Sequence, residues 1–163
     1  MAITYTPIAT STATGSTSSL TFSSIPSTYT DLVLIIAGSD TSIGSNTLAQ
    51  FNSDTGTNYS QTRLYGDGTS AASDRVSNDV KIIVGRLAAS GGVANGIAHI
   101  MNYSNTTTYK TSISRSNNAA SISAAVVGLW RSVSAITSIY LYTSNGSNFT
   151  SGSTFTLYGI KSA

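Results

Sequence analysis

The stretch Asp31-Leu32-Val33-Leu34-Ile35-Ile36-Ala37-Gly38 holds the longest unbroken apolar run of the chain, from Leu32 to Ala37. This run is far shorter than the roughly 20 apolar residues that a membrane-spanning helix needs. A short continuous apolar run is typical of a β-strand that is buried on both of its faces. We therefore predict a buried strand from Asp31 to Gly38.

Further short segments with strand character lie on both sides of this run. Many of them alternate apolar and polar residues, and Gly, Asn, Asp and Ser separate them, as turn residues do. Turn signals of this kind are Tyr65-Gly66-Asp67-Gly68 and Asn145-Gly146. The predicted strands are Ile3–Ile8, Leu20–Phe22, Thr47–Asn52, Gln61–Tyr65, Val80–Leu87, Val93–Tyr103, Tyr109–Ser114, Ile122–Arg131, Ile136–Thr143 and Phe155–Lys161.

Composition favours the same class of fold. Charged residues make up 9% of the 163 residues, against about a quarter in an ordinary globular protein. All acidic residues are Asp, and the helix-forming Glu is absent. The chain is therefore predicted to be all-β: one β-sandwich or jelly-roll-like domain over residues 1–163, with about ten short strands and little or no helix.

Two segments leave alternatives open at this stage. The alanines in Ala119–Trp130 would allow a helix, although the β-branched residues at its end favour a strand. The Ser/Thr-rich segment Ala9–Ser19 is either a flexible loop or an arm that reaches a neighbouring molecule.

Groups able to carry out catalysis are scarce. His99 is the single histidine and is surrounded by apolar residues, which is typical of a histidine on a strand face. Each of the six Asp residues lies next to turn-forming residues or Arg, so paired catalytic carboxylates are not indicated. We predict no catalytic residue and no enzymatic activity.

No cofactor or metal site is predicted either. The chain has no Cys and one His, which argues against zinc. The run Asn52-Ser53-Asp54-Thr55-Gly56-Thr57-Asn58 spaces oxygen ligands as a Ca²⁺ loop does, but it lacks the later bidentate Glu. Calcium therefore stays an open alternative, and glycine-rich phosphate loops are not found.

Charge and targeting signals narrow the class of partner. The net charge is +2, and the eight cationic residues are spread along the chain instead of forming a stripe. Nucleic-acid binding is therefore not expected. No signal-peptide pattern is present, and no membrane association is expected.

Four tyrosines form the one candidate binding set. Tyr59, Tyr65, Tyr103 and Tyr109 lie beside polar loops. A tyrosine offers an apolar ring face and a polar hydroxyl, so such residues suit either a glycan or an interface between subunits. Half-buried positions at strand ends are the third interpretation.

Two parts of the chain resemble a group of small β-sandwich virion proteins of tailed bacteriophages, including phages of cyanobacteria. The resemblance is carried by Leu20–Leu34, and by Gly128-Leu129-Trp130-Arg131-Ser132, Ala135–Ile139, Asn148-Phe149 and Gly152–Ile160. It implies core positions at Phe22, Ile25, Leu32, Leu34, Trp130, Ile136, Phe155, Leu157 and Ile160.

The resemblance implies a structural role in a virion that is assembled in the host cytoplasm. One interpretation is a capsid decoration or cement protein that binds and stabilises the outer surface of the major capsid lattice, with the major capsid protein and copies of itself, as a homotrimer, for partners. The alternative is the receptor-binding tip of a tail fibre or spike that binds host glycans. Strand-like sequence begins close to Met1, without a repetitive shaft before it, so the capsid role is favoured.

Overall fold

The computed structural model describes residues 4–118 and 121–161, and these residues form twelve strands and no helix. Ala119 and Ala120 lie outside the described residues. With no helix among the described residues, no helical segment there is able to cross a membrane. The strands are β1 (Tyr5–Thr12), β2 (Ser19–Phe22), β3 (Asp31–Gly38), β4 (Asn46–Phe51), β5 (Tyr59–Gly66), β6 (Ala71–Asp79), β7 (Ile82–Arg86), β8 (Ala94–Met101), β9 (Lys110–Asn118), β10 (Ile122–Trp130), β11 (Ile139–Thr143) and β12 (Thr154–Ile160).

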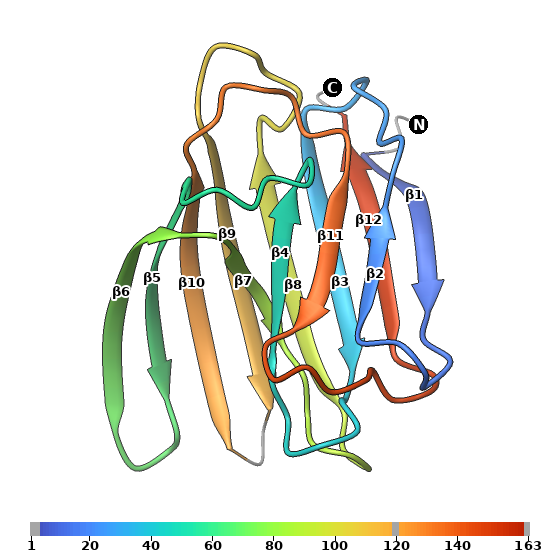
Figure 1. Ribbon diagram of the computed structural model, residues 1–163, viewed down its shortest axis with the longest axis vertical. Helices are drawn as coiled ribbons and strands as arrows, with labels where there is room; N and C mark the ends of the chain where they lie inside the picture. Colours follow the sequence, from blue (N-terminus) through green and yellow to red (C-terminus); the bar gives the residue numbers. More distant parts are fainter. Residues whose placement is uncertain (1–3, 119–120, 162–163) are drawn as a thin grey trace.

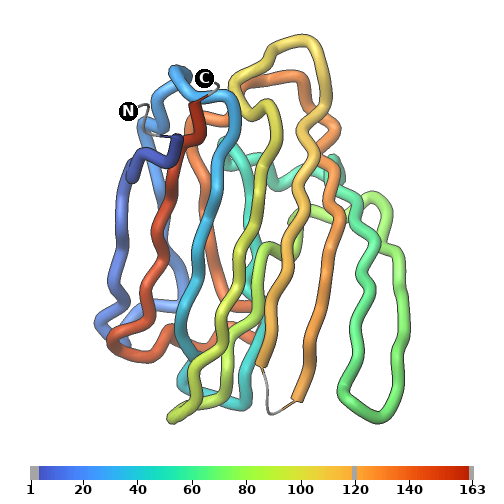
Figure 2. The backbone as a smooth tube through the Cα atoms, turned by 180° about the vertical axis from the view of Figure 1, so that it is seen from behind, coloured from blue at the N-terminus to red at the C-terminus, as the bar shows by residue number. Residues whose placement is uncertain are grey.

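The strands form two antiparallel sheets that pack face to face (Figure 1). The large sheet has eight strands in the order β1-β12-β3-β8-β9-β10-β5-β6, and the small sheet has four in the order β2-β11-β4-β7. The small sheet covers one face of the large sheet. Seen from behind, the other face of the large sheet is covered by no further layer of backbone (Figure 2). The prediction of an all-β sandwich is confirmed.

Side chains that alternate along each strand fill the space between the sheets. The aromatic cluster at one end is formed by Phe51, Tyr59 and Trp130, with ring centroids of Phe51 and Trp130 5.5 Å apart. Eight of the nine predicted core residues are buried to at least 95%. They are Phe22, Ile25, Leu32, Leu34, Trp130, Ile136, Phe155 and Leu157.

Ile160 is the exception, because it is half-buried. Phe155 and Leu157 point into the core, and Ile160 lies an odd number of residues from both. Successive side chains of a strand point to opposite faces, so Ile160 lies on the outward side of β12. The prediction of a core position there is wrong.

Residues 9–19 run along the edge of the sandwich. Ala9 to Thr12 belong to β1 and pair with β12. Beyond β1, the N–H of Ala13 donates to the carbonyl of Ser153 at 2.8 Å. The carbonyl of Ser18 accepts from the N–H of Thr143 at 3.1 Å, so backbone hydrogen bonds join this segment to the C-terminal part of the chain.

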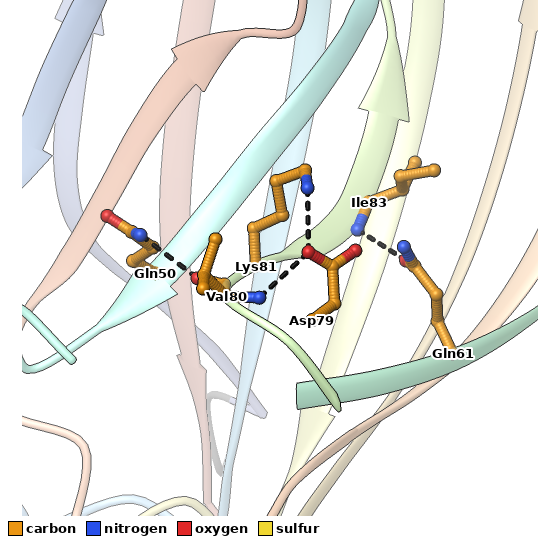
Figure 3. Close-up of polar contacts among 6 residues, drawn as sticks. All are labelled: Gln50, Gln61, Asp79, Val80, Lys81 and Ile83. Carbon is orange, nitrogen blue, oxygen red and sulfur yellow. Dashed lines mark hydrogen bonds and ion pairs between the residues drawn. The ribbon is translucent and has the colours of Figure 1, made fainter. Parts of the chain in front are cut away.

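The chain crosses from the large to the small sheet between β6 and β7, where side chains of both sheets fix it (Figure 3). The Gln50 side chain of β4 donates to the carbonyl of Val80 at 2.9 Å, and Gln61 of β5 accepts from the N–H of Ile83 at 2.8 Å. Asp79 accepts from Lys81 Nζ at 2.7 Å. β5 and β6 lie at the end of the large sheet that reaches beyond the small one (Figure 1).

Candidate interaction face

The face of the large sheet that is turned away from the small sheet, here called the outer face, is open. In β3, Leu32, Leu34 and Ile36 point into the core and are fully buried. Ile35 points the other way and remains 42% exposed. Val33 also points outward but is only 2% exposed, and it lies opposite His99 and Tyr158 in the register. The predicted burial of β3 on both faces is therefore correct at Val33 and wrong at Ile35, where no second layer covers the sheet.

Aliphatic side chains of five neighbouring strands occupy the middle of this outer face. The exposed fractions are 42% for Ile35, 61% for Leu64, 48% for Ile113 and 55% for Val127. Ile113 and Val127 are direct partners in the register of β9 and β10. Ile97 of β8 is half-buried and lies opposite Ile35 of β3. We call these five residues the aliphatic patch. The largest exposed apolar patch of a protein is often an interaction site.

An open groove of about 840 Å³ lies beside the patch, at the end of the sheet toward the β5–β6 turn. Its lining includes Ile35, Leu64 and Ile97 of the patch together with Arg115. A smaller hollow of about 330 Å³ adjoins it and also contains Arg115. A volume of this size is within the range of ligand-binding sites in proteins.

Arg115 is the one charged residue that lines the groove and the hollow. On β9 it lies opposite Ile97 of β8 and opposite Ala125 of β10. Its side chain is exposed. Among the described residues it takes part in none of the ion pairs or side-chain hydrogen bonds. The groove therefore carries an uncompensated positive charge on an aliphatic floor.

Three short polar side chains form the neighbouring row of the groove. Asn95, Asn117 and Ser123 lie directly opposite one another on β8, β9 and β10. All three are exposed and line the groove. They offer donors and acceptors next to the aliphatic floor.

His99 also lies on the outer face, where Asp31 holds it. His99 Nε2 is 2.8 Å from Asp31 Oδ2, and Asp31 Oδ1 accepts from the N–H of Asn102 at 2.6 Å. The two side chains come from the neighbouring strands β3 and β8. The sequence did not indicate this partner, because Asp31 and His99 are far apart in the chain. The pair connects the start of β3 with the end of β8.

The four predicted tyrosines do not form one site. Tyr59 and Tyr103 are fully buried. The Tyr59 hydroxyl accepts from the N–H of Phe51 at 2.9 Å, and burial raises the pKa of this phenol well above its usual range. Tyr65 is half-buried beneath the guanidinium of Arg63, 4.5 Å from the ring centroid. Tyr109 is 53% exposed in a different part of the surface.

Asp54 organises the loop that resembled a Ca²⁺ site. Its Oδ1 accepts from the N–H of Gly56 at 2.8 Å, and its Oδ2 accepts from Trp130 Nε1 at 2.6 Å and from Asn58 Nδ2 at 3.0 Å. Burial alone would raise the pKa of this carboxyl, but the hydrogen bonds outweigh it and hold the pKa below its usual value. Both oxygens are used in anchoring Trp130 and the turn. Within the described ranges, 4–118 and 121–161, no group of three or more His, Cys, Asp or Glu residues is arranged for a metal.

Comparison with known proteins gives no relative from which a role could be transferred. No family model matches the chain, and no curated protein matches its sequence. The interaction face therefore has to be interpreted from its own geometry.

The residues of the outer face were missed in the sequence for one reason. Val126-Val127 and Leu34-Ile35-Ile36 place apolar residues on both faces of their strands. At Leu34-Ile35-Ile36 this signal also fits burial on both faces, which is the prediction for Asp31–Gly38, so it does not by itself indicate an exposed outer face. Nothing in the sequence distinguishes Arg115 as a binding residue, because it is one of eight Lys and Arg residues spread along the chain.

Proposed function

We propose that this protein is a structural subunit of a phage virion, a decoration protein that packs through its aliphatic patch against the outer surface of the capsid. The exposed patch on five neighbouring strands is the observation that carries the proposal. Burial of exposed aliphatic surface drives protein association. In an isolated subunit the patch is in contact with water, which is unfavourable for apolar surface. A partner that covers the patch would remove this contact.

The extent of the outer face suits such a contact. Five strands at a spacing of about 4.8 Å span about 24 Å, and six residues along a strand add about 20 Å. The flat area is thus about 480 Å². It includes Arg115, His99 and the polar row of Asn95, Asn117 and Ser123 as well as the aliphatic patch. The flat area is of the same order as the ~800 Å² that each partner contributes to a stable interface.

The composition fits the same role. The absence of Cys makes the chain independent of a maintained redox state outside a cell. The low charge density limits repulsion between closely spaced copies. Copies of the protein, arranged as a homotrimer, are expected to surround symmetry positions of the lattice.

Counting copies in purified virions by quantitative mass spectrometry tests the location. A capsid decoration protein is expected at a copy number comparable with that of the major capsid protein. A few copies per particle would contradict the capsid role and favour the tail-tip alternative. In that alternative a glycan would have to bind elsewhere than at Tyr59 and Tyr103, which are buried.

A binding assay tests the surface. Particles that lack the protein are incubated with the purified chain and sedimented. Val127→Thr keeps a β-branched side chain but adds a hydroxyl to the patch, so we expect weaker binding. Val133→Thr is the matched control, because Val133 is 46% exposed and lies outside the strands. Equal binding of the two variants would exclude the patch as the contact surface.

A further inference from the structure

The charge of Arg115 restricts what is able to cover the aliphatic patch. Arg115 lies between Ile97 and Ala125 at the centre of the groove. A partner that packs on the patch takes the guanidinium out of water. Burial of an unpaired cation is costly, whereas a paired and hydrogen-bonded one is tolerated.

This protein offers no carboxylate for that purpose within its described residues. No Asp lines the groove or the adjoining hollow. Asp67 follows the groove residue Gly66, but its carboxylate accepts from the N–H groups of Thr69 and Ser70 within the β5–β6 turn. Asp31, which is on the same face, is engaged by His99 and by the N–H of Asn102. Asp74 is paired with Arg63, whose side chain lies against Tyr65 on the other face of β5. The compensating charge therefore has to come from the partner.

The surroundings of Arg115 also distinguish between kinds of partner. Nucleic acid is recognised by several cations along a stripe, and this groove holds one. Sugar rings bind best on exposed aromatic faces, but the one aromatic residue at the groove is Tyr65, whose ring carries the Arg63 guanidinium. Aliphatic side chains beside a guanidinium fit a protein segment of mixed aliphatic and acidic character. A guanidinium binds a carboxylate through two parallel hydrogen bonds.

The row of polar side chains supplies the remaining contacts. Asn95, Asn117 and Ser123 make no side-chain hydrogen bond among the described residues and face the same groove. Their amide and hydroxyl groups are able to bind the backbone of an extended segment that lies across β8, β9 and β10.

We propose that the groove binds a protein segment that presents a carboxylate between aliphatic side chains, and that Arg115 pairs with this carboxylate. The inference rests on the proposed function, since it describes the partner of the same face. It adds the chemical identity of the contact, which packing of the patch alone does not specify.

Two matched peptides test the pairing. Acetyl-Leu-Asp-Leu-amide and acetyl-Leu-Asn-Leu-amide differ only in the carboxylate and are titrated to millimolar concentration into the whole protein. Binding is followed by NMR at the methyl groups of Ile35, Leu64 and Ile97. We expect the Asp peptide to bind about three- to ten-fold more tightly than the Asn peptide, as an exposed charge-assisted pair allows.

Variants identify the residue responsible. Arg115→Gln is expected to reduce binding of the Asp peptide to the level of the Asn peptide. Arg75→Gln is the control, because it removes the same net charge. Arg75 is exposed on β6 of the same sheet. Equal binding of the two peptides, an equal loss in both variants, or no shift at the three methyl groups would each overturn the inference.

The peptide experiment is able to fail while the proposed function stands, and the reverse also holds. If Val127→Thr abolishes binding to particles while the peptides show no preference, the packing role stands and the carboxylate partner is wrong. If the Asp peptide depends on Arg115 while the virion holds only a few copies, the groove is a carboxylate site in a protein that does not decorate the capsid.

Discussion

The two outward faces of this sandwich are built from the same kind of strand, yet they cover their apolar residues to different degrees. On the large sheet Val33 is buried opposite Tyr158 and His99, but the aliphatic patch beside it is exposed. On the small sheet, Leu48 points outward but is only 4% exposed. It lies between Tyr142 of β11 and Ile83 of β7 in the register. The rings of Tyr140 and Tyr142 stack 5.2 Å apart on the same face. On the large sheet, Leu64 is also outward and is 61% exposed.

Side-chain size explains this difference. A tyrosine ring is long enough to lie over its cross-strand neighbours, and its hydroxyl still reaches water. Isoleucine, leucine and valine stand nearly perpendicular to a sheet and leave gaps between rows. The small sheet thus needs no partner for its outward face, whereas the large sheet keeps a surface that a partner would cover.

Replacing the two outward leucines tests the comparison most directly. We expect Leu48→Ala to lower the free energy of unfolding by about 2–3 kcal/mol, as for other buried leucines. Leu64→Ala should change it by less than about 0.5 kcal/mol, because its side chain is already in water. Urea denaturation measures both. Similar losses would show that the two faces are covered to the same degree.

Asp54 belongs to neither outward face, so its loss should weaken the fold without altering the aliphatic patch. Asp54→Asn removes the charged acceptor of Trp130 Nε1 and should cost about 1–3 kcal/mol. Because the native pKa is lower than the value near 3.9 in unfolded chains, the carboxylate stabilises the native state above that pH. This contribution is lost as the pH falls through the native pKa.

Urea titrations of the two proteins between neutral and acidic pH provide the measurement. The difference between wild type and Asp54→Asn should shrink toward low pH. Trp130→Phe removes the donor and also leaves a cavity in the core, so it is costly in either background, but it should cost less when Asp54 is already Asn than in the wild type. A pH-independent difference would mean that the Asp54 carboxylate does not titrate with a lowered pKa.

His99 interrupts the apolar rows of the large sheet, so removing it should enlarge the patch at a small cost. We expect His99→Val to lower the free energy of unfolding by about 1 kcal/mol, because one hydrogen bond between two partly exposed side chains is lost. Binding of an apolar fluorescent dye to the native protein should increase. Thr111→Val is the matched control for stability, because it also places a valine on the outward side of the large sheet, in β9, but leaves the Asp31–His99 hydrogen bond in place. A loss as large as that of Leu48→Ala would make the Asp31–His99 pair a main support of the sheet.

The smallest change in stability is expected at the centre of the patch. Val127→Thr should alter the free energy of unfolding by less than about 0.5 kcal/mol, since Val127 is 55% exposed. Dye fluorescence should nevertheless fall relative to wild type and to Val133→Thr. A stability loss without any change in dye binding would indicate that Val127 packs within the sheet and is not part of an exposed patch.

Much of the fold was predictable because its signals are local. Alternation at Phe155 and Leu157 and the turn at Gly66-Asp67 each involve a few neighbouring residues. β6 was missed, since Ala71–Asp79 is a mostly exposed edge strand with few apolar residues. An edge strand depends on its pairing with β5, and that partner is not visible in its own sequence.

The candidate site was harder to predict than the fold. Tyr59 and Tyr103 stand next to polar residues in the sequence, but their rings fill the core and their hydroxyls bond to the backbone. Proximity to a polar loop in sequence does not fix the direction of a side chain. Arg115 gains its significance only from Ile97 and Ala125, which belong to other strands.

The sequence by itself determined that this chain is all-β, where most of its strands lie and which residues enter the core. These properties follow from composition and from a two-residue period, both of which act over short distances along the chain. Only the tertiary structure decided which face of each strand is covered. A continuous run such as Leu32–Ala37 is apolar on both sides. On its outward side Val33 is buried opposite His99 and Tyr158, whereas Ile35 stays exposed, because the small sheet packs against one face of the large sheet alone.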